Sequence, residues 1–276
     1  MLHIGWFSTA RGSSSRVLLN SVHERIQAGR LDARIDFVFC SREPGESENT
    51  DLFLKQVQDY RIPLVCVSVK KFAQGLQQPV GARDGNLPAW RLEYDRQVMD
   101  RLKDYDCKLC LLAGYMLIAG PEMCSRYDMI NLHPALPDGP KGTWQEVIWQ
   151  LIRENAAGSG VMMHLVTPDL DRGPVTSFCR FPIRGPDFDP LWEAVKSRPL
   201  ESILAQEGQE NGLFKLIRHH GFQREIPLIV HTIQAFSSGR IRISGKKLLD
   251  AGGQPLAGYD LTGEIDREIG DGSPQK

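Results

Sequence analysis

The sequence has no long hydrophobic run and no excess of charge of either sign. None of its apolar stretches approaches the roughly 20 residues that a helix needs to cross a bilayer, and its first residues, MLHIGWFSTARGSSS, lack the basic-then-apolar order of a signal peptide. Its 33 Lys and Arg nearly balance its 34 Asp and Glu, with a pI near 6.7. We therefore expect a cytoplasmic protein with neither nucleic acid nor membrane as a partner. A small-molecule anionic ligand held locally stays open. Its oligomeric state is left open.

Cysteine is sparse, and its placement is not that of a disulfide framework. Two of the six cysteines, Cys107 and Cys110, form a C-x-x-C pair within DCKLCLLAGYM, which is a predicted strand. Redox pairs usually open helices, and a zinc site needs further ligands. The sequence predicts no metal site and reduced, buried thiols throughout. These thiols belong to Cys40, Cys66, Cys107, Cys110, Cys124 and Cys179.

The turn after the first predicted strand lacks the glycines of a dinucleotide-binding fingerprint. G-x-G-x-x-G needs three glycines, and FSTARGSSSRVLL contains only Gly12. The same turn opens a predicted helix, where backbone N–H groups and the helix dipole can hold an anion. Two readings stay open: Ser13 or Ser14 caps the helix, or Gly12, Ser13 and Ser14 hold a single phosphate group.

The first 182 residues alternate short β-rich runs with segments of helical periodicity. Strands are predicted at 2–7, 34–40, 63–69, 108–116, 127–132, 160–166 and 175–183, and helices at 15–29, 49–60 and 144–155. This alternation predicts an α/β fold with a Rossmann-like, mostly parallel sheet. Residues 70–90 form a long polar loop that is either mobile or part of a site. Residues 187–238 read as helices that cover the sheet, in a domain of residues 1–245, followed by a hairpin and a fraying polar tail over 246–276.

Two strong hydrogen-bonding side chains, Asn131 and His133, end one predicted strand on the same face. In α/β sheets the carboxyl ends of strands are where ligands bind. The amide can donate to a developing oxyanion, and the imidazole can polarise a carbonyl or move a proton. Asp171 follows in VTPDLDRGPV, whose Gly and Pro predict a reversal toward this site. Because no Ser or Cys nucleophile accompanies these residues, we expect a substrate group to attack an acyl donor directly. A lone histidine at a strand end is otherwise more often structural.

Four motifs in this order, RGSSS, AGYM, NLHPALP and HLVTPDLDRGPV, resemble those of the folate-dependent formyltransferases. The likeness covers about residues 2 to 182 and resumes over 226–241. It implies the formyltransferase fold, 10-formyltetrahydrofolate as the formyl donor, no metal, and the amine of glycinamide ribonucleotide, in purine biosynthesis, as the acceptor. The resemblance implies catalytic roles for Asn131, His133 and Asp171, a pterin pocket at Tyr115, Met116, Leu117 and Ile118, a folate-tail contact at Arg91, and phosphate contacts at Gly12, Ser13 and Ser14. His164 also matches a family histidine.

The sequence departs from the family pattern mainly where the acceptor would bind. Its phosphate loop reads G-S-S instead of G-S-N, Ala135 replaces a serine, and Leu117 replaces an arginine. Phe222 stands where a glutamate is expected to hold the ribonucleotide, and Glu225 lies at a different register. Residues 184–212 also form a longer segment than usual. Another phosphorylated amine as acceptor, hydrolysis of the donor, and a folate-binding regulatory role without turnover therefore stay open as alternatives.

Overall fold

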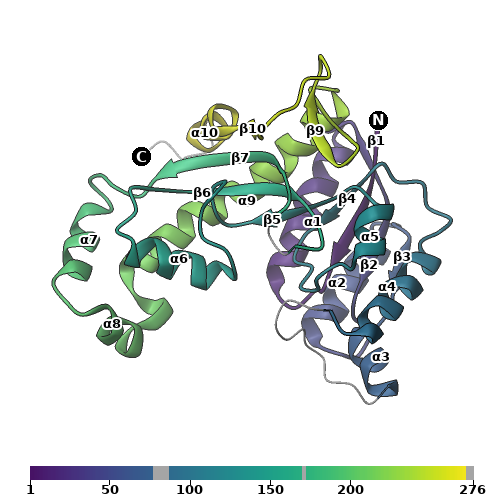
Figure 1. The fold of residues 1–276 in the computed structure, drawn as a ribbon, viewed down its shortest axis with the longest axis horizontal. Helices are drawn as coiled ribbons and strands as arrows, with labels where there is room; N and C mark the ends of the chain where they lie inside the picture. The colour runs from purple at the N-terminus through teal and green to yellow at the C-terminus, as the bar shows by residue number, and fades with distance from the viewer. Residues whose placement is uncertain (77–86, 170–171, 272–276) are drawn as a thin grey trace. The chain divides into compact units, whose positions relative to one another are not determined.

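A computed structural model describes residues 1–76, 87–169 and 172–271. Within these residues, eight strands form one sheet in the hydrogen-bonded order β10-β7-β6-β5-β4-β1-β2-β3 (Figure 1). The strands are β1 Leu2–Ser8, β2 Ala33–Cys40, β3 Leu64–Cys66, β4 Leu109–Leu112, β5 Met129–His133, β6 Gly158–Leu165, β7 Val175–Pro182 and β10 Tyr259–Asp260. The predicted α/β fold with a mostly parallel sheet and a helical C-terminal region is confirmed.

The chain divides into two compact units. Unit 1 comprises Met1–Leu132, His164–Pro174 and Ile233–Leu256, and unit 2 comprises His133–Met163, Val175–Thr232 and Ala257–Lys276. Strands β5 and β6 each contribute residues to both units. Among the described helices, none combines the length and the apolar character that a membrane crossing requires.

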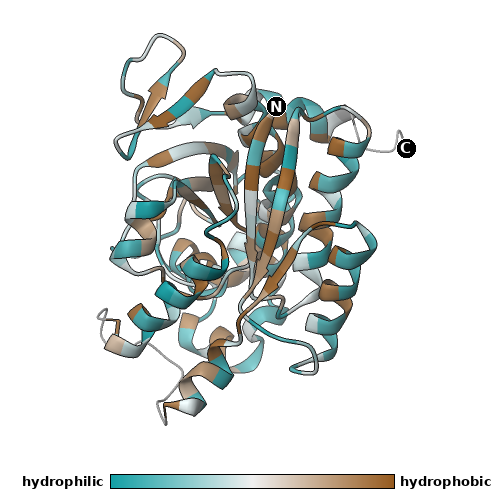
Figure 2. Cartoon of the chain, turned by 90° about the vertical axis from the view of Figure 1, so that its right-hand side faces the viewer, coloured by the Kyte–Doolittle hydropathy of each residue, from teal (hydrophilic) through white to brown (hydrophobic). Residues whose placement is uncertain are grey.

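Unit 1 is built on five parallel strands. β1 pairs with β2 and β4, β2 pairs with β3, and β4 pairs with β5, all in parallel. Such strands carry nearly continuous apolar runs because helices cover them, and Figure 2 shows hydrophobic stretches along the strands. All four residues of β4 are buried. The helices are α1 Ser13–Gln27, which packs on α2 Glu48–Asp59, and α4 Ala89–Arg101, which packs on α3 Val69–Gly75 and α5 Pro121–Arg126.

Unit 2 contains the longest helix of the described chain, α9 Gly212–Ser237, of which residues 212–232 belong to this unit. Pro227 lies inside α9, although an interior proline costs about 3 kcal/mol or more. The helix continues because its apolar side chains on both sides of the proline, including Ile217 and Leu228, are buried. The other helices are α6 Trp144–Arg153, α7 Asp189–Lys196, α8 Leu200–Gln206, the 3-10 turn η1 Gly208–Glu210 and α10 Thr262–Asp271.

Three segments differ from the sequence prediction. The predicted strand over 63–69 ends at Cys66, and helix α3 begins at Val69 and continues into the segment predicted as a loop. Ser68 caps α3 by accepting from the Lys71 N–H at 3.0 Å, a local signal that alternating apolar residues obscured. The sequence predicts one helical stretch that ends at Gly221 and another that begins at Glu225, but residues 212–237 form one helix. The polar tail predicted to fray contains helix α10.

A hairpin is formed by strands β8 Ile241–Ser244 and β9 Lys247–Asp250, which pair antiparallel, so its first strand lies before the predicted segment 246–276. The predicted boundary between residues 245 and 246 falls in the turn of this hairpin, so a division there stays a prediction. Lys246 has a positive φ of 61° in the same turn, and its Nζ reaches the Asp128 carboxylate at 2.8 Å. The hairpin is thereby attached to unit 1.

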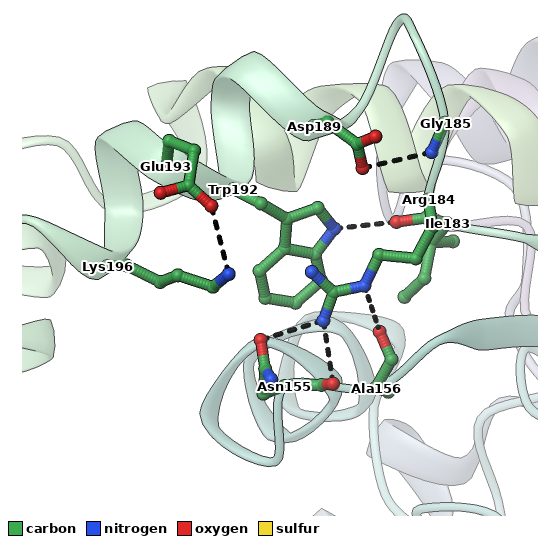
Figure 3. Close-up of polar contacts among 9 residues, drawn as sticks. All are labelled: Asn155, Ala156, Ile183, Arg184, Gly185, Asp189, Trp192, Glu193 and Lys196. Atoms are coloured by element: carbon green, nitrogen blue, oxygen red, sulfur yellow. Dashed lines mark hydrogen bonds and ion pairs between the residues drawn. The ribbon is translucent and has the colours of Figure 1, made fainter.

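Arg184 anchors the long segment 184–212 within unit 2 (Figure 3). Its Nη2 donates to the carbonyl and the side-chain oxygen of Asn155, each at 2.7 Å, and its Nε donates to the carbonyl of Ala156 at 3.1 Å. Its guanidinium stacks 3.8 Å from the ring centroid of Trp192 on α7. Trp192 in turn donates from Nε1 to the carbonyl of Ile183. One cation therefore joins the turn after α6 to helix α7.

We expect Arg184→Ala to lower the free energy of unfolding by about 1.5 to 3 kcal/mol, because hydrogen bonds to a charged group are lost together with the stacking on Trp192. Urea denaturation measures this loss. Lys196→Ala, which removes an exposed ion pair with Glu193 on the same helix, is the control and should stay within about 0.5 kcal/mol of the parent. Equal effects of the two substitutions would contradict the anchoring role.

Candidate active site

The candidate site in unit 1 begins with the register of its central strands. Phe7 on β1 lies opposite Leu112 on β4, and Leu112 lies opposite Asn131 on β5. The segments that follow these three parallel strands therefore leave the sheet at the same edge, the edge at which α/β folds bind ligands. These segments contain most of the site residues predicted from the sequence.

Thr9, directly after β1, connects this edge through one buried hydroxyl group. Its Oγ1 accepts from the backbone N–H of Met116 at 2.9 Å and from the hydroxyl of Ser41 at 3.0 Å. Its backbone N–H donates to the carbonyl of Gly114 at 3.0 Å. Thr9 thus fixes the start of the Tyr115–Ile118 segment relative to β1. The sequence analysis missed Thr9 and Ser41, because nothing in their local pattern distinguishes them from ordinary loop residues.

Gly114 lets the loops after β1 and β4 approach each other closely. Its φ is +71°, in the left-handed region that favours glycine. A Cβ at this position would lie 3.1 Å from Oγ of Ser15. Ala10 also has a positive φ, 52°, and its backbone is held by the hydroxyls of Ser8 and Thr50. Such strain in a non-glycine residue is concentrated at functional sites.

The predicted phosphate loop leaves the N-terminus of α1 uncapped. The N-cap residue is Gly12, in extended backbone, and among the described side chains none caps the helix. Capping by Ser13 or Ser14, one of the two readings of the sequence, is therefore not what the structure has. The two serines are exposed in the first turn, which contains no acidic residue. The free N–H groups and the helix dipole at this point favour an anion.

Asn131, at the end of β5, is oriented by His164 on β6. Nδ1 of His164 lies 3.0 Å from the carbonyl oxygen of Leu165, which can only accept, so Nδ1 carries a proton. In the neutral ring, Nε2 then accepts from Nδ2 of Asn131 at 3.4 Å. His164 is 3% exposed, whereas Asn131 is half-buried. In this arrangement one N–H of the Asn131 amide donates to His164, and its second N–H can donate to a ligand.

His133 closes β5 and belongs to unit 2. Its side chain is buried, and Nε2 lies 3.1 Å from the carbonyl of Pro140 in the loop that follows, so Nε2 carries a proton. Residues two apart in a strand face the same side of the sheet, so His133 and Asn131 share a face of β5, as the sequence predicts. Asp171, the third predicted catalytic residue, lies outside the described residues.

The predicted folate residues lie in two places. Tyr115–Ile118 follow β4, and Arg91 lies in α4. Tyr115 is buried against Phe7 and Phe39, with its hydroxyl lacking a partner among the described residues, whereas Met116 is 56% exposed. Leu117 and Ile118 are half-buried. Arg91 is 4% exposed and donates from Nη2 to the carbonyl of Ile118 at 2.8 Å. The structure therefore brings Arg91 to the end of this segment.

Arg91 is held by a buried carboxylate. Its Nη2 lies 3.2 Å from Oδ1 of Asp95, and Oδ2 of Asp95 accepts from the backbone N–H of Gly120 at 2.6 Å. Burial raises the pKa of Asp95, and the nearby Arg91 opposes that rise. Nη1 of Arg91 has no partner among the described residues. Arg91 can therefore donate from Nη1 to one further acceptor while it keeps its ion pair with Asp95.

Unit 2 contains a cavity of about 380 Å³ on the α9 side, lined by residues that include Arg218 and Phe222. The Arg218 guanidinium lies over the rings of both Trp144 and Phe222, 4.7 and 5.0 Å from their centroids. Arg218 also donates to Glu225, which is 7% exposed. Burial raises the pKa of Glu225, with Arg218 opposing the rise. In this structure the carboxylate of Glu225 is engaged by Arg218.

A parallel α/β sheet with polar groups gathered at the carboxyl ends of β1, β4 and β5 defines a ligand-binding fold of the Rossmann-like class. Comparison with known proteins makes the assignment specific, because a family model described as formyl transferase matches residues 12–187, more than half of the chain. The chain belongs to the formyl transferase family. The predicted family resemblance is thus confirmed.

Individual relatives agree with this assignment. Phosphoribosylglycinamide formyltransferase of Escherichia coli K12 is 31% identical over 173 residues, which cover 61% of this chain and 68% of the relative. The solved phosphoribosylglycinamide formyltransferase of Coxiella burnetii superposes with a TM-score of 0.64 at 22% identity, covering 94% and 98% of the two chains. A formyltetrahydrofolate deformylase of Burkholderia mallei does so at 0.56 and 19% identity, covering 91% and 70%. These two structures have the same fold as this chain.

We expect Thr9→Val to lower the free energy of unfolding by about 1 to 3 kcal/mol, because the N–H of Met116 and the buried hydroxyl of Ser41 both lose their acceptor. Thr9→Ser keeps the hydroxyl and should recover most of this loss. Denaturation midpoints of the three proteins measure the effect. If the serine variant were as unstable as the valine variant, the methyl group rather than the hydrogen bonds would account for the stability.

Proposed function

We propose that this chain transfers the formyl group of 10-formyltetrahydrofolate to the primary amine of glycinamide ribonucleotide, as a cytoplasmic enzyme of purine biosynthesis. The observation that carries the proposal is the Asn131 amide, held by His164 at the end of β5 in a member of the formyl transferase family. The Escherichia coli relative, named for this activity, supports the choice of acceptor. The uncapped N-terminus of α1 supports an acceptor that carries a phosphate.

The proposed chemistry is a direct acyl transfer. The acceptor amine attacks the formyl carbon, and the electrons of the carbonyl double bond move to the formyl oxygen. The free N–H of Asn131 donates to this oxygen as negative charge develops on it. The charge then returns to re-form the double bond, the bond from the formyl carbon to the donor nitrogen breaks, and that nitrogen gains a proton while the former amine loses one. No enzyme-bound covalent intermediate is required.

His133 and Asp171 complete the proposed catalytic group. His133 shares the strand face of Asn131, and we assign it to hold the formyl oxygen together with Asn131. We assign Asp171 to support His133 and the proton transfer. The buried position of His133 restricts its contact with water, which favours directed hydrogen bonding over general solvation.

Residues of unit 1 fit a folate donor. Met116 presents an exposed apolar side chain suited to a flat ring, directly after the backbone contact with Thr9. The partially buried Leu117 and Ile118 extend this apolar segment. Nη1 of Arg91 provides a buried donor for an acceptor group of the folate, such as a carboxylate. We place the donor on Arg91 and Tyr115–Ile118 for these reasons.

Hydrolysis of the donor, with water in place of the amine, is the second candidate function. Phe222 favours it, because a phenyl ring cannot hydrogen-bond to the hydroxyls of a ribose, and Glu225 is engaged by Arg218. The uncapped α1 N-terminus favours the transferase, because a hydrolase needs no phosphate site. A third possibility, transfer to another phosphorylated amine, is compatible with both observations.

The test is to mix the protein with 10-formyltetrahydrofolate and to follow tetrahydrofolate formation by absorbance, with and without glycinamide ribonucleotide. The proposal expects formation that depends on the ribonucleotide. Formation at the same rate without any amine, together with release of formate, would identify a hydrolase. An inert donor under every condition would overturn both enzyme assignments.

We expect Asn131→Ala to lower kcat by about a hundredfold or more while the protein stays folded, because one oxyanion donor is lost. Steady-state kinetics and circular dichroism measure the two effects. Asn49→Ala, a substitution on helix α2 of the same unit, is the control and should leave kcat unchanged. Near-normal turnover of Asn131→Ala would exclude this amide from the mechanism.

We expect Ser14→Asp to raise the KM for glycinamide ribonucleotide by about tenfold or more and to leave the KM for the folate donor unchanged. A carboxylate at the start of α1 would occupy the positive end of the helix dipole and repel the phosphate. Ser14→Asn adds similar volume without charge and serves as the control. If Ser14→Asp and Ser14→Asn had the same KM for the acceptor, the assignment of the phosphate to this loop would be wrong.

A further inference from the structure

Two cysteines at the start of β4 have their sulfur atoms in van der Waals contact. Cys107 precedes the strand and Cys110 lies within it, both in unit 1, with their Sγ atoms 3.4 Å apart. A disulfide requires sulfur atoms at about 2.05 Å. The remaining gap is about 1.4 Å, and a bend at Lys108 brings the two residues together. The strand predicted over 108–116 therefore begins one residue later, and the pair is not part of an extended run.

The structure confines the sulfur of Cys110. Gly5 on β1 is paired directly with Cys110, and a Cβ at Gly5 would lie 3.2 Å from this sulfur and 2.5 Å from the ring of Phe37. Only glycine leaves space for both groups at this point. Cys110 is fully buried, whereas Cys107 is half-buried at the margin of the core. The pair therefore consists of a half-buried cysteine and a fully buried cysteine whose sulfur atoms lie next to each other.

Among the cysteines whose pKa the structure indicates to be shifted, Cys107 has the most acidic thiol. A hydrogen bond from Cys110 lowers the pKa of Cys107, whereas the same hydrogen bond and burial raise the pKa of Cys110. Burial raises the pKa of Cys40 to about 12. Burial likewise raises the pKa values of three further thiols to about 11, those of Cys66, Cys124 and Cys179. The thiolate is the reactive form, so attack on an oxidant should start at Cys107.

We propose that Cys107 and Cys110 form a thiol–disulfide couple that exchanges with small disulfides such as glutathione disulfide. The thiolate of Cys107 attacks one sulfur of glutathione disulfide, the sulfur–sulfur bond breaks, and the first glutathione leaves and takes up a proton. Cys110 then attacks the sulfur of Cys107, the bond between Cys107 and glutathione breaks, and the second glutathione leaves as a thiol with the proton that Cys110 gives up. The protein loses two electrons, and one glutathione disulfide is reduced to two thiols. This couple is independent of the proposed formyl transfer.

The position of the pair separates it from the candidate active site. Cys110 lies opposite Met129 on β5, and Leu112, two residues later, lies opposite Asn131. A bond between Cys107 and Cys110 would tie the bend at Lys108 to strand β4. Because the pair lies away from the candidate active site, its oxidation is measured on the cysteines themselves and needs no enzymatic assay.

The test is to incubate the full-length reduced protein with excess glutathione disulfide, quench it with acid, and measure intact mass and the map of modified cysteines. The parent should form a disulfide between Cys107 and Cys110 without retaining glutathione. Cys110→Ser should retain one glutathione on Cys107, because the resolving thiol is missing. Cys107→Ser should react at least about tenfold more slowly than the parent.

Cys66→Ser is the matched control, because Cys66 is also half-buried but has a raised pKa, and this variant should behave as the parent. Alkylation of the unmodified parent by iodoacetamide gives a second measurement that needs no variant to fold, with Cys107 expected to react at least about tenfold faster than Cys66. Stable glutathione on Cys107 of the parent, or oxidation centred on another cysteine, would overturn the proposal.

Discussion

The parallel hydrogen bonding of β1, β4 and β5 is the constraint on which the candidate site depends. Phe7, Leu112 and Asn131 lie at matching registers across the three strands, so the segments that follow them emerge at one edge of the sheet. The hydroxyl of Thr9 then joins two of these segments, and His164 orients the Asn131 amide. A slip of one residue in β5 would turn the side chain of Asn131 to the opposite face of the sheet.

Charge is distributed at this edge in two different ways. At the start of α1, backbone N–H groups are left without a side-chain cap, so the positive end of the helix stays available to an external anion. At Arg91, the positive charge is already matched inside the protein by Asp95, and the remaining donor capacity is directional rather than electrostatic. The first arrangement suits a phosphate, whose charge it can stabilise. The second suits a ligand that is positioned by hydrogen-bond geometry.

The sequence predicts the fold class and the position of the candidate residues because both follow from local patterns. The alternation of strands and helices indicates the parallel sheet, and the Asn-x-His ending places two polar groups on one strand face. The functions of Thr9 and His164 could not be predicted, since their partners, such as Met116 and Asn131, are distant in the chain. Tertiary packing also decided the continuity of α9 through Pro227. The contact between Cys107 and Cys110 depends on a bend that the apolar run conceals.

The central claim is that the formyl group passes to an amine and not to water. Carbon-13 NMR of the reaction with formyl-labelled 10-formyltetrahydrofolate and glycinamide ribonucleotide tests it most directly, because the formamide carbon of the product and the carbon of free formate give separate signals. The account predicts that nearly all of the label appears in the formamide of the ribonucleotide. Label that accumulates in formate, at a rate that the ribonucleotide does not change, would contradict it.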